Sequence, residues 1–280
     1  MEEVAQVVGR KRETRANKGA PGPDSGTWDQ SRRGAPGPAQ LGTGDGRRAN
    51  KGAPGPAQLG TGVGQRPPGR LVPRRFFYPA PELVAPRLLG KLLVHATRAG
   101  VLAGRIVEVE AYLGPHNPEP DAAAHSHRGV TPRNRVIFET AGHAYVYSIY
   151  GRYFCMNVTC EPEGQAGCVL VRALEPVLGI ARMARNRGLA ANAPLREIAS
   201  GPGRLCQALG LTRTRHNGLD LADPHSILQL RDDGDAPTEA IVTARIGIRH
   251  AVELPLRFAL PGHASVSGRK SLTGERVPIA

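Results

Sequence analysis

The aromatic residues of this chain are distributed unevenly, and their positions limit which part of it can build a core. All six tyrosines and all five phenylalanines lie at Phe76 or later, and only Trp28 precedes them. Glycine, proline, alanine and arginine dominate the first 70 residues, a composition that buries too little apolar surface to offset the entropy of ordering. We therefore expect residues 1–72 to be a disordered basic tail and residues 73–280 to form one folded domain.

The predicted tail repeats itself without the features of a repeat architecture. The segment RGAPGPAQLGTG that begins at Arg33 returns as KGAPGPAQLGTG at Lys51. The spacing of the copies is irregular and no apolar face recurs, so they could not stack as solenoid repeats do. Three interpretations stay open: an arm that helps to hold nucleic acid, an inert linker, and a stretch upstream of the true start codon.

The net charge favours a polyanionic partner. The chain carries a formal charge of +13, of which residues 1–70 contribute +6 and the predicted domain +7. A strongly basic surface is the electrostatic footprint of nucleic acid, although many basic proteins have no such partner. Charge alone therefore leaves the two readings about even.

Cysteine usage and hydropathy argue against several other classes of protein. The four cysteines show neither a CxxC pair nor ligand spacing with histidine, so we expect no metal, no cofactor and no disulfide framework. No apolar run is long enough to span a membrane, and the polar start lacks the apolar core of a signal peptide. We therefore expect a soluble, intracellular protein without a membrane partner. A monomer in the bacterial cytoplasm, associated with the chromosome, is a further expectation that does not follow from these patterns.

Hydrophobic patterning in the domain predicts a mixed α/β (α+β) fold. Helices are expected at 79–90, 180–188 and 200–210, the last begun by Ser200 and Pro202. Strands are expected at 91–97, 101–112, 143–150, 153–160, 168–174, 226–230 and 239–248. Glu175-Pro176 reads as a turn, and residues 114–134 as a long functional loop. The arrangement is a single domain with a curved, largely antiparallel sheet and peripheral helices.

The predicted strand AGRIVEVEAYLG, from Ala103 to Gly114, carries two glutamates. Alternation along the strand predicts one polar face, made by Ile106, Glu108, Glu110 and Tyr112. The plain alternative is a solvated face with ordinary surface charges. A carboxylate in a pocket that excludes water is instead suited to activating a water molecule. Two glutamates that point the same way would not flank a glycosidic bond as paired carboxylates do.

Four of the six tyrosines lie within nine positions, at Tyr145, Tyr147, Tyr150 and Tyr153. Core packing accounts for one or two of them, but each buried hydroxyl needs a partner, and four fit better as stacking surfaces for bases or sugars. Tyr150 directly precedes Gly151 and so falls at a hairpin tip. A protruding tyrosine at a turn is the type of side chain that wedges into a duplex.

Six blocks of the sequence, in order, resemble the alkyladenine (3-methyladenine) DNA glycosylase family: IVEVEAYLGP, AAHS, TPRNR, YVYSIYGRYFCMN, CVLVRALEP and SGPGRLCQAL. The resemblance covers roughly residues 76–258. The sequence departs from the family pattern at His127, at Arg152 and around Gly262. The resemblance implies an enzyme that flips damaged purines, alkylated or deaminated, out of double-stranded DNA and hydrolyses the N-glycosidic bond, leaving an abasic site.

The resemblance also implies which residues do the chemistry. Glu110 matches the general base that activates the water, and Arg172 matches an arginine near that water and the DNA backbone. Tyr150 matches the side chain inserted into the gap left by the flipped nucleotide. The predicted domain holds only Lys91 and Lys270, neither beside a motif, so no Schiff-base lysine is indicated and we expect a monofunctional enzyme without lyase activity.

The base-binding pocket is implied in the same way. The flipped base stacks between Tyr112, His125 and Tyr147, while Asn157 faces its minor-groove edge and excludes the exocyclic amine of guanine. Two alternatives to this enzyme remain. A non-catalytic binder of damaged DNA would share the pocket, and a glycosidase acting on free nucleosides or RNA would not need Tyr150.

Overall fold

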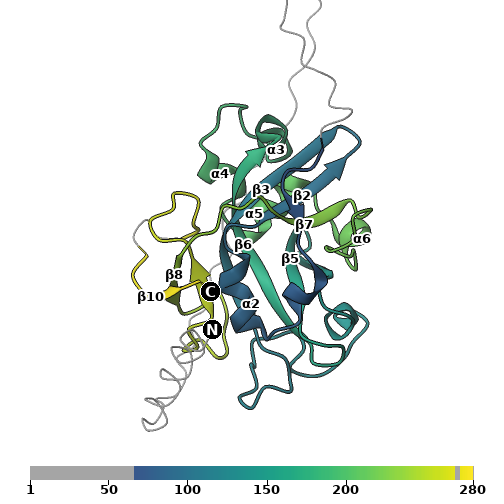
Figure 1. Ribbon diagram of the computed structural model, residues 1–280, viewed down its shortest axis with the longest axis vertical. Helices are drawn as coiled ribbons and strands as arrows, with labels where there is room; N and C mark the ends of the chain where they lie inside the picture. Colours follow the sequence, from purple (N-terminus) through teal and green to yellow (C-terminus); the bar gives the residue numbers. More distant parts are fainter. Residues whose placement is uncertain (1–65, 269–271, 280) are drawn as a thin grey trace, which may run out of the picture. The chain divides into compact units, whose positions relative to one another are not determined.

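One sheet organises the residues that the computed structural model describes, 66–268 and 272–279. Its main path runs in the order β1-β7-β2-β3-β6-β5-β4, and every pairing is antiparallel (Figure 1). The strands on this path are β1 (Arg70–Leu71), β2 (Leu92–Thr97), β3 (Gly100–Tyr112), β4 (Ala144–Ile149), β5 (Tyr153–Cys160), β6 (Gly167–Leu178) and β7 (Leu228–Asp232). The predicted hairpin and meander are thus present.

Three short strands extend the sheet from β3, and sequence patterning identified only the first of them. They are β8 (Glu239–Thr243), β9 (Arg257–Ala259) and β10 (Glu275–Pro278). The second, β9, pairs with both β3 and β8, and β10 pairs with β8. The strand β3 therefore pairs with β6 along one edge and with β2 and then β9 along the other.

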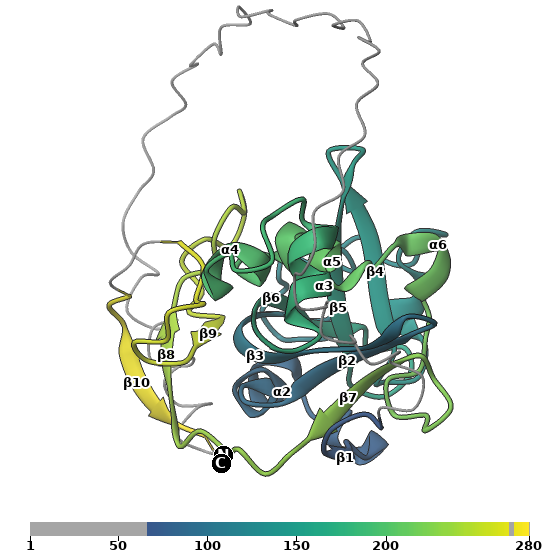
Figure 2. The same ribbon diagram turned by 90° about the horizontal axis from the view of Figure 1, so that it is seen from above.

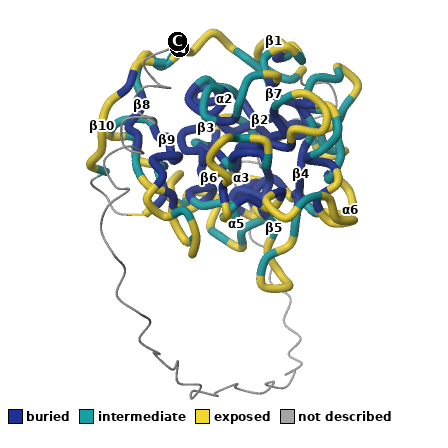
Figure 3. Tube along the Cα trace, turned by 90° about the horizontal axis from the view of Figure 1, so that it is seen from below, coloured by how far each residue is buried: buried dark blue, intermediate teal, exposed yellow. Residues whose placement is uncertain are grey.

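Short helices cover both faces of the sheet. They are α2 (Pro81–Leu88), α3 (Ile180–Asn186), α4 (Leu195–Ala199), α5 (Pro202–Leu209) and α6 (Arg213–His216), with 3-10 turns η1 (Arg74–Phe77) and η2 (Arg135–Phe138). Helix α2 lies on one side of β3, and α3 and α5 lie on the other (Figure 2). The described residues belong to one compact unit of the predicted α+β class, with a curved sheet. Figure 3 shows the inner strands of the sheet buried and most connecting loops exposed, whereas most residues of the short strands β1 and β10 are not buried.

The described fold starts slightly before the predicted boundary at residue 73. Residues 70 and 71 form the edge strand β1 against β7, and Val72 is buried. Residues 1–65 of the predicted tail lie outside the described residues, so its disorder stays a prediction.

The N-cap of helix α5 lies one residue later than the predicted Ser200. Pro202 occupies the first turn, and Gly210 closes the helix with a φ of 71°, a left-handed value that glycine adopts without strain. Gly201 is the N-cap, and Ser200 instead forms a β-bridge with Ala173. The prediction that Ser200 starts this helix was wrong, because its backbone pairs with the edge of β6.

The predicted turn at Glu175-Pro176 was also wrong, because β6 continues through it to Leu178. Pro176 lies opposite Gly104, beside a shift of register between residues 103 and 104. A proline is tolerated at such an irregularity because it lacks the N–H that a regular ladder position would use.

A second irregularity changes which side chains share the face of the two glutamates. Ile106 pairs with Leu174 and Glu108 pairs with Ala173, with a register shift between them. Alternation does not carry across such a shift. Ile106 packs into the main hydrophobic core with Val109 and Ala111, whereas Glu108 and Glu110 both contact Arg172, so the prediction that Ile106 shares the face of the glutamates was wrong. The solvated-face alternative is also excluded, since Glu108 and Glu110 are both 0% exposed.

Glu161, the residue after β5, gives the protein an expected pH dependence. Burial, and then the charge of Glu82, raise the pKa of Glu161 from 4.5 to about 7, with a hydrogen bond from the Gly167 backbone opposing them. The folded state therefore binds this proton more tightly than the unfolded chain. The stability contributed by protonated Glu161 is fully present below pH 4.5, the pKa in the unfolded chain. It is lost as the pH rises to about 7, the pKa in the folded protein.

Replacing Glu161 with glutamine should remove this dependence. The variant is expected to be more stable than the wild type at about pH 8 by about 1 kcal/mol, a value reduced for the partial exposure of the side chain. Urea denaturation of both proteins at about pH 5 and about pH 8 measures the difference. Equal changes of unfolding free energy with pH in the two proteins would contradict the raised pKa.

Candidate active site

Four strands of the sheet project one row of side chains onto a common surface. Glu110 of β3 pairs with Leu170 of β6, Leu170 pairs with Asn157 of β5, and Asn157 pairs with Tyr145 of β4. Directly paired residues of antiparallel strands point to the same face. The register alone therefore brings together a glutamate, an amide and a tyrosine that are far apart in the sequence.

A cavity of about 310 Å³ opens on this surface. All seven residues singled out from the sequence line it: Glu110, Tyr112, His125, Tyr147, Tyr150, Asn157 and Arg172. Its volume is at the lower end of the range of small-molecule pockets, about 300–1,000 Å³. Pro202, at the start of α5, and the segment 246–248 are also part of the lining.

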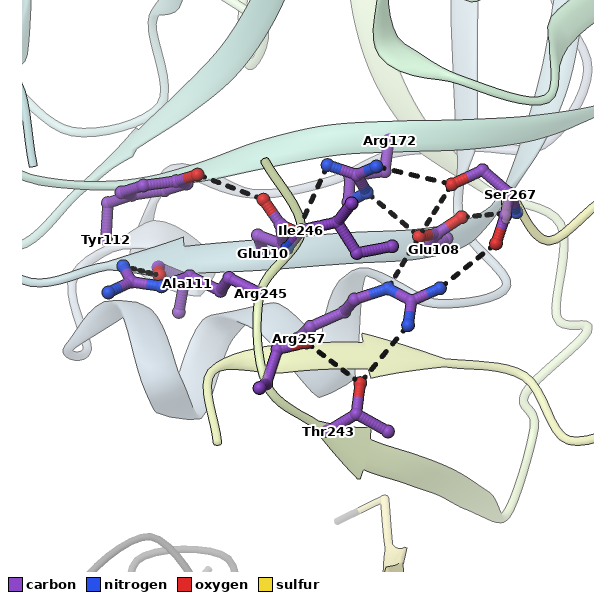
Figure 4. Close-up of polar contacts among 11 residues, drawn as sticks. Glu108, Glu110, Ala111, Tyr112, Arg172, Thr243, Arg245, Ile246, Arg257 and Ser267 are labelled. Carbon is purple, nitrogen blue, oxygen red and sulfur yellow. Dashed lines mark hydrogen bonds and ion pairs between the residues drawn. The ribbon is translucent and has the colours of Figure 1, made fainter. Parts of the chain in front are cut away.

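Glu110 is fully buried, and three donors fix its carboxylate (Figure 4). The Tyr112 hydroxyl donates to Oε2 at 2.9 Å, and the backbone N–H of Ile246 donates to Oε1 at 2.8 Å. Nη1 of Arg172 lies 3.1 Å from Oε1. Burial, and then the charge of Glu110, raise the pKa of Tyr112, so this phenol stays protonated and able to donate.

The donor from Ile246 was missed by sequence reasoning. Residues 239–248 were expected to form one strand, but β8 ends at Thr243. The chain then leaves the sheet and passes across the pocket, where Gly247 has a φ of 75°. A backbone N–H carries no side-chain signature, so only the fold identifies this contact.

Glu108, the other glutamate of β3, has a different environment. Its carboxylate accepts bonds from Nε of Arg172 at 2.9 Å and from Nε of Arg257 at 2.7 Å. The backbone N–H and the hydroxyl of Ser267 donate at 2.6 and 2.9 Å. Burial opposes ionisation, but Arg172, Arg257 and Ser267 together outweigh it and hold the pKa of Glu108 below its usual value.

The aromatic wall of the cavity is a cluster of three rings. Tyr145 and Tyr147 stack with their centroids 5.3 Å apart, and His125 meets Tyr147 edge-on at 4.5 Å. Nδ1 of His125 and the hydroxyl of Tyr145 share a hydrogen bond of 2.9 Å. Burial, and then the charge of Arg133, lower the pKa of His125, which favours a neutral imidazole. The wall is therefore built of aromatic rings, with Arg133 over the ring of Tyr147.

Asn157 presents its amide to the cavity in one orientation. Its Nδ2 donates to the Tyr145 carbonyl at 3.2 Å, and its Oδ1 lies 3.9 Å from the Cys168 thiol, which donates to it. The side chain is 3% exposed, so these contacts hold it in the pocket wall.

Tyr150 lies at the tip of the β4–β5 hairpin and is 90% exposed. Its φ of 48° and that of 68° at Gly151 are both left-handed, as in the I′ turns that suit twisted hairpins. The Arg152 N–H closes the turn on the Ile149 carbonyl at 3.3 Å. The turn thus holds an aromatic side chain out at the rim of the cavity.

The part of the chain that the structure describes has neither a group of side chains suited to a metal ion nor a helix suited to span a membrane. Residues 66–268 and 272–279 contain no group of three or more His, Cys, Asp or Glu side chains placed to hold a metal ion. Their helices are all too short or too polar to cross a bilayer. The expectation that no cofactor is needed stays a prediction.

The chain is similar to known proteins over most of the described domain. Residues 75–264 match the family model described as methylpurine-DNA glycosylase (MPG). A protein of Koribacter versatilis is 52% identical over 72% of this chain and 95% of its own length. Proteins of Methanoculleus marisnigri and Burkholderia lata are 50% and 44% identical, over 71% and 72% of this chain and 99% and 93% of their own. All three bear a provisional designation as 3-methyladenine DNA glycosylases.

Proposed function

The chain belongs to the methylpurine-DNA glycosylase family, and from this premise we propose that it flips alkylated or deaminated purines out of duplex DNA and hydrolyses their N-glycosidic bond. The product is an abasic site. The observation that supports this most is the buried carboxylate of Glu110, which has three fixed donors and opens into a cavity walled by flat side chains. We further propose that it works as a monomer on the bacterial chromosome in the cytoplasm.

The cavity wall suits a flipped purine. Extruding a base costs a few kcal/mol, and least for a damaged or weakly paired one. The rings of Tyr112, His125 and Tyr147 then stack on the base. Alkylation at N3 or N7 makes a purine cationic, and this adds a cation–π attraction of roughly 0.5–2 kcal/mol. The fixed amide of Asn157 faces the minor-groove edge of the base and excludes the exocyclic amine of guanine.

Glu110 acts on the water in the proposed mechanism. Its carboxylate takes a proton from a water whose oxygen bonds to C1′ of the deoxyribose, while the C1′–N bond breaks and its electron pair leaves with the base. The negative charge also stabilises the oxocarbenium character that develops on the sugar. The side chain of Arg172, 3.1 Å from Glu110, holds the carboxylate in place.

No lysine is placed for a lyase reaction in the described residues. Lys91 ends in an ion pair with Asp232, at 2.7 Å, and does not line the cavity. Lys270 lies outside the described residues. A Schiff base needs an amine at C1′, so we propose that the enzyme is monofunctional and stops at the abasic site.

Single-turnover release of free base from duplexes that carry 7-methylguanine or hypoxanthine tests the function. Release of either base from the damaged strand, with none from an undamaged duplex, is expected. If lesions are bound but neither base is released, the protein is a binder of damaged DNA and the proposed activity is wrong.

Replacing Tyr150 with serine should slow base release from duplex DNA. The wedge compensates for unstacking, which costs a few kcal/mol, so the single-turnover rate is expected to fall about tenfold or more. Release from a single-stranded oligonucleotide should change little, because no stack is disrupted there. Tyr78→Ser is a matched control, since Tyr78 is 46% exposed and does not line the cavity. An unchanged rate on the duplex would instead favour a glycosidase acting on free nucleosides or RNA, which would not need Tyr150.

A further inference from the structure

Arg172 is held by two buried carboxylates at once. Its Nε donates to Glu108 at 2.9 Å, and its Nη1 lies 3.1 Å from Glu110. Its Nη2 lies 3.4 Å from the hydroxyl of Ser267. The guanidinium is planar and its donors have fixed directions. The contact of Arg172 with Glu108 therefore fixes the direction from which its Nη1 approaches Glu110.

Glu108 itself is not placed to touch a substrate. It is fully buried and does not line the cavity. Its two oxygens already accept four hydrogen bonds, from Arg172, Arg257 and twice from Ser267. A carboxylate that accepts four hydrogen bonds holds its neighbours in place and is not free to take a proton from water.

Arg257 is anchored in turn by the far end of the domain. It lies on β9, directly opposite Glu110 of β3. Its Nη1 donates to Thr243 Oγ1 of β8 at 3.2 Å, and its Nη2 donates to the Ser267 carbonyl at 3.1 Å. The segment 257–267 thus closes the back of the site, behind the pocket wall.

The charges of this cluster balance. Two glutamates meet two arginines, and the side chains of Glu108, Glu110, Arg172 and Arg257 are 0%, 0%, 9% and 4% exposed. Removing one charge from a buried set leaves another uncompensated. The loss of Glu108 would leave two guanidiniums for one carboxylate. Arg172 would then turn its fork fully onto Glu110 and occupy the oxygen positions that a water needs.

We propose that Glu108, Arg257 and Ser267 are positioning residues that hold Arg172 against Glu110 and keep the buried charges of the active site balanced. This inference rests on the proposed function. These three residues lie outside the pocket and affect catalysis by orienting Arg172, whose side chain lines it.

The test compares Glu108→Gln with the double variant Glu108→Gln/Arg257→Gln. A misplaced catalytic group typically costs about 100-fold in rate, and the single variant should lose about that much in single-turnover base release. Its affinity for lesion-containing duplex should stay close to that of the wild type. The double variant restores the balance of charge and is expected to recover part of the lost rate, which a packing defect would not allow. Glu163→Gln, at an exposed position, is the matched control.

The outcomes separate this inference from the proposed function. If the wild type releases base and Glu108→Gln releases it at the same rate per folded molecule, the positioning role is wrong, even if the variant is less stable. A double variant slower than the single one would also overturn it. If Glu108→Gln does not fold, Arg257→Lys decides, since it keeps the charge and should retain more activity than Arg257→Gln. Absence of release by the wild type would overturn the proposed function, and this inference with it.

Discussion

Replacing Glu110 with glutamine is expected to abolish base release and to leave the binding of lesion-containing duplex intact. Glutamine has the same shape, so the cavity and its stacking rings persist. It lacks the negative charge that takes the proton from water and stabilises the developing oxocarbenium ion. Its amide also presents donors where Tyr112, Arg172 and the Ile246 N–H already donate. Loss of base catalysis and of charge stabilisation predicts a fall of about 1,000-fold or more.

Single-turnover release of hypoxanthine and 7-methylguanine, with wild type and variant side by side, measures this fall. Binding of the same duplexes to both proteins supplies the second quantity. Glu163→Gln makes the same chemical change at an exposed position and should release base at the wild-type rate. A Glu110→Gln protein that binds and turns over like the wild type would mean that another group activates the water.

Replacing Arg245 with methionine should lower the free energy of unfolding more than any other substitution proposed for this protein. Nη1 and Nη2 of Arg245 donate to the two oxygens of Asp121 at 2.5 and 2.8 Å, and both side chains are 0% exposed. The guanidinium also lies 4.6 Å from the centroid of the Tyr112 ring. Its removal leaves the Asp121 carboxylate buried without its cation, which typically costs about 3–5 kcal/mol.

Urea denaturation of Arg245→Met and wild type gives this loss as a difference in unfolding free energy. Arg135→Met is the contrasting control, because Arg135 pairs with Glu139 at 3.2 Å on the surface, with side chains 76% and 44% exposed. That pair should contribute less than about 1 kcal/mol. Asp121→Asn added to Arg245→Met should restore part of the stability. Similar losses at the buried and exposed arginines would contradict this account.

Part of the central sheet could be predicted from alternation, where consecutive strands are joined by short turns. The hairpin of β2 and β3 and the meander of β4, β5 and β6 follow from local patterns. The errors fall where long-range pairing overrides a local signal. Ser200 forms a β-bridge with Ala173 and therefore does not cap the helix. Pro176 lies within β6, beside a shift of register, and therefore does not end the strand. The three-residue strand β9 has no periodicity to detect.

The candidate site divides in the same way. A glutamate strand and a run of tyrosines are visible in the sequence, and family resemblance extends them to His125, Asn157 and Arg172. The backing of the site is not visible, because Arg257 and Ser267 lie 149 and 159 positions from Glu108 in the sequence. Arg257 and Ser267 reach Glu108 only once β9 has paired with β3. Such ion pairs have no spacing that a linear pattern can reveal.

The hairpin tip has a consequence for the order in which damage is recognised under the proposed function. Tyr150 is held out by a turn that is already formed without DNA, and it stands at the rim of the cavity. A preformed probe responds to how easily a base pair comes apart, and the pocket behind it responds to the identity of the base. The stability of the base pair is then tested first, by Tyr150, and the structure of the base second, by the pocket. An undamaged purine that leaves the stack by chance must still fit the pocket before its N-glycosidic bond can be hydrolysed.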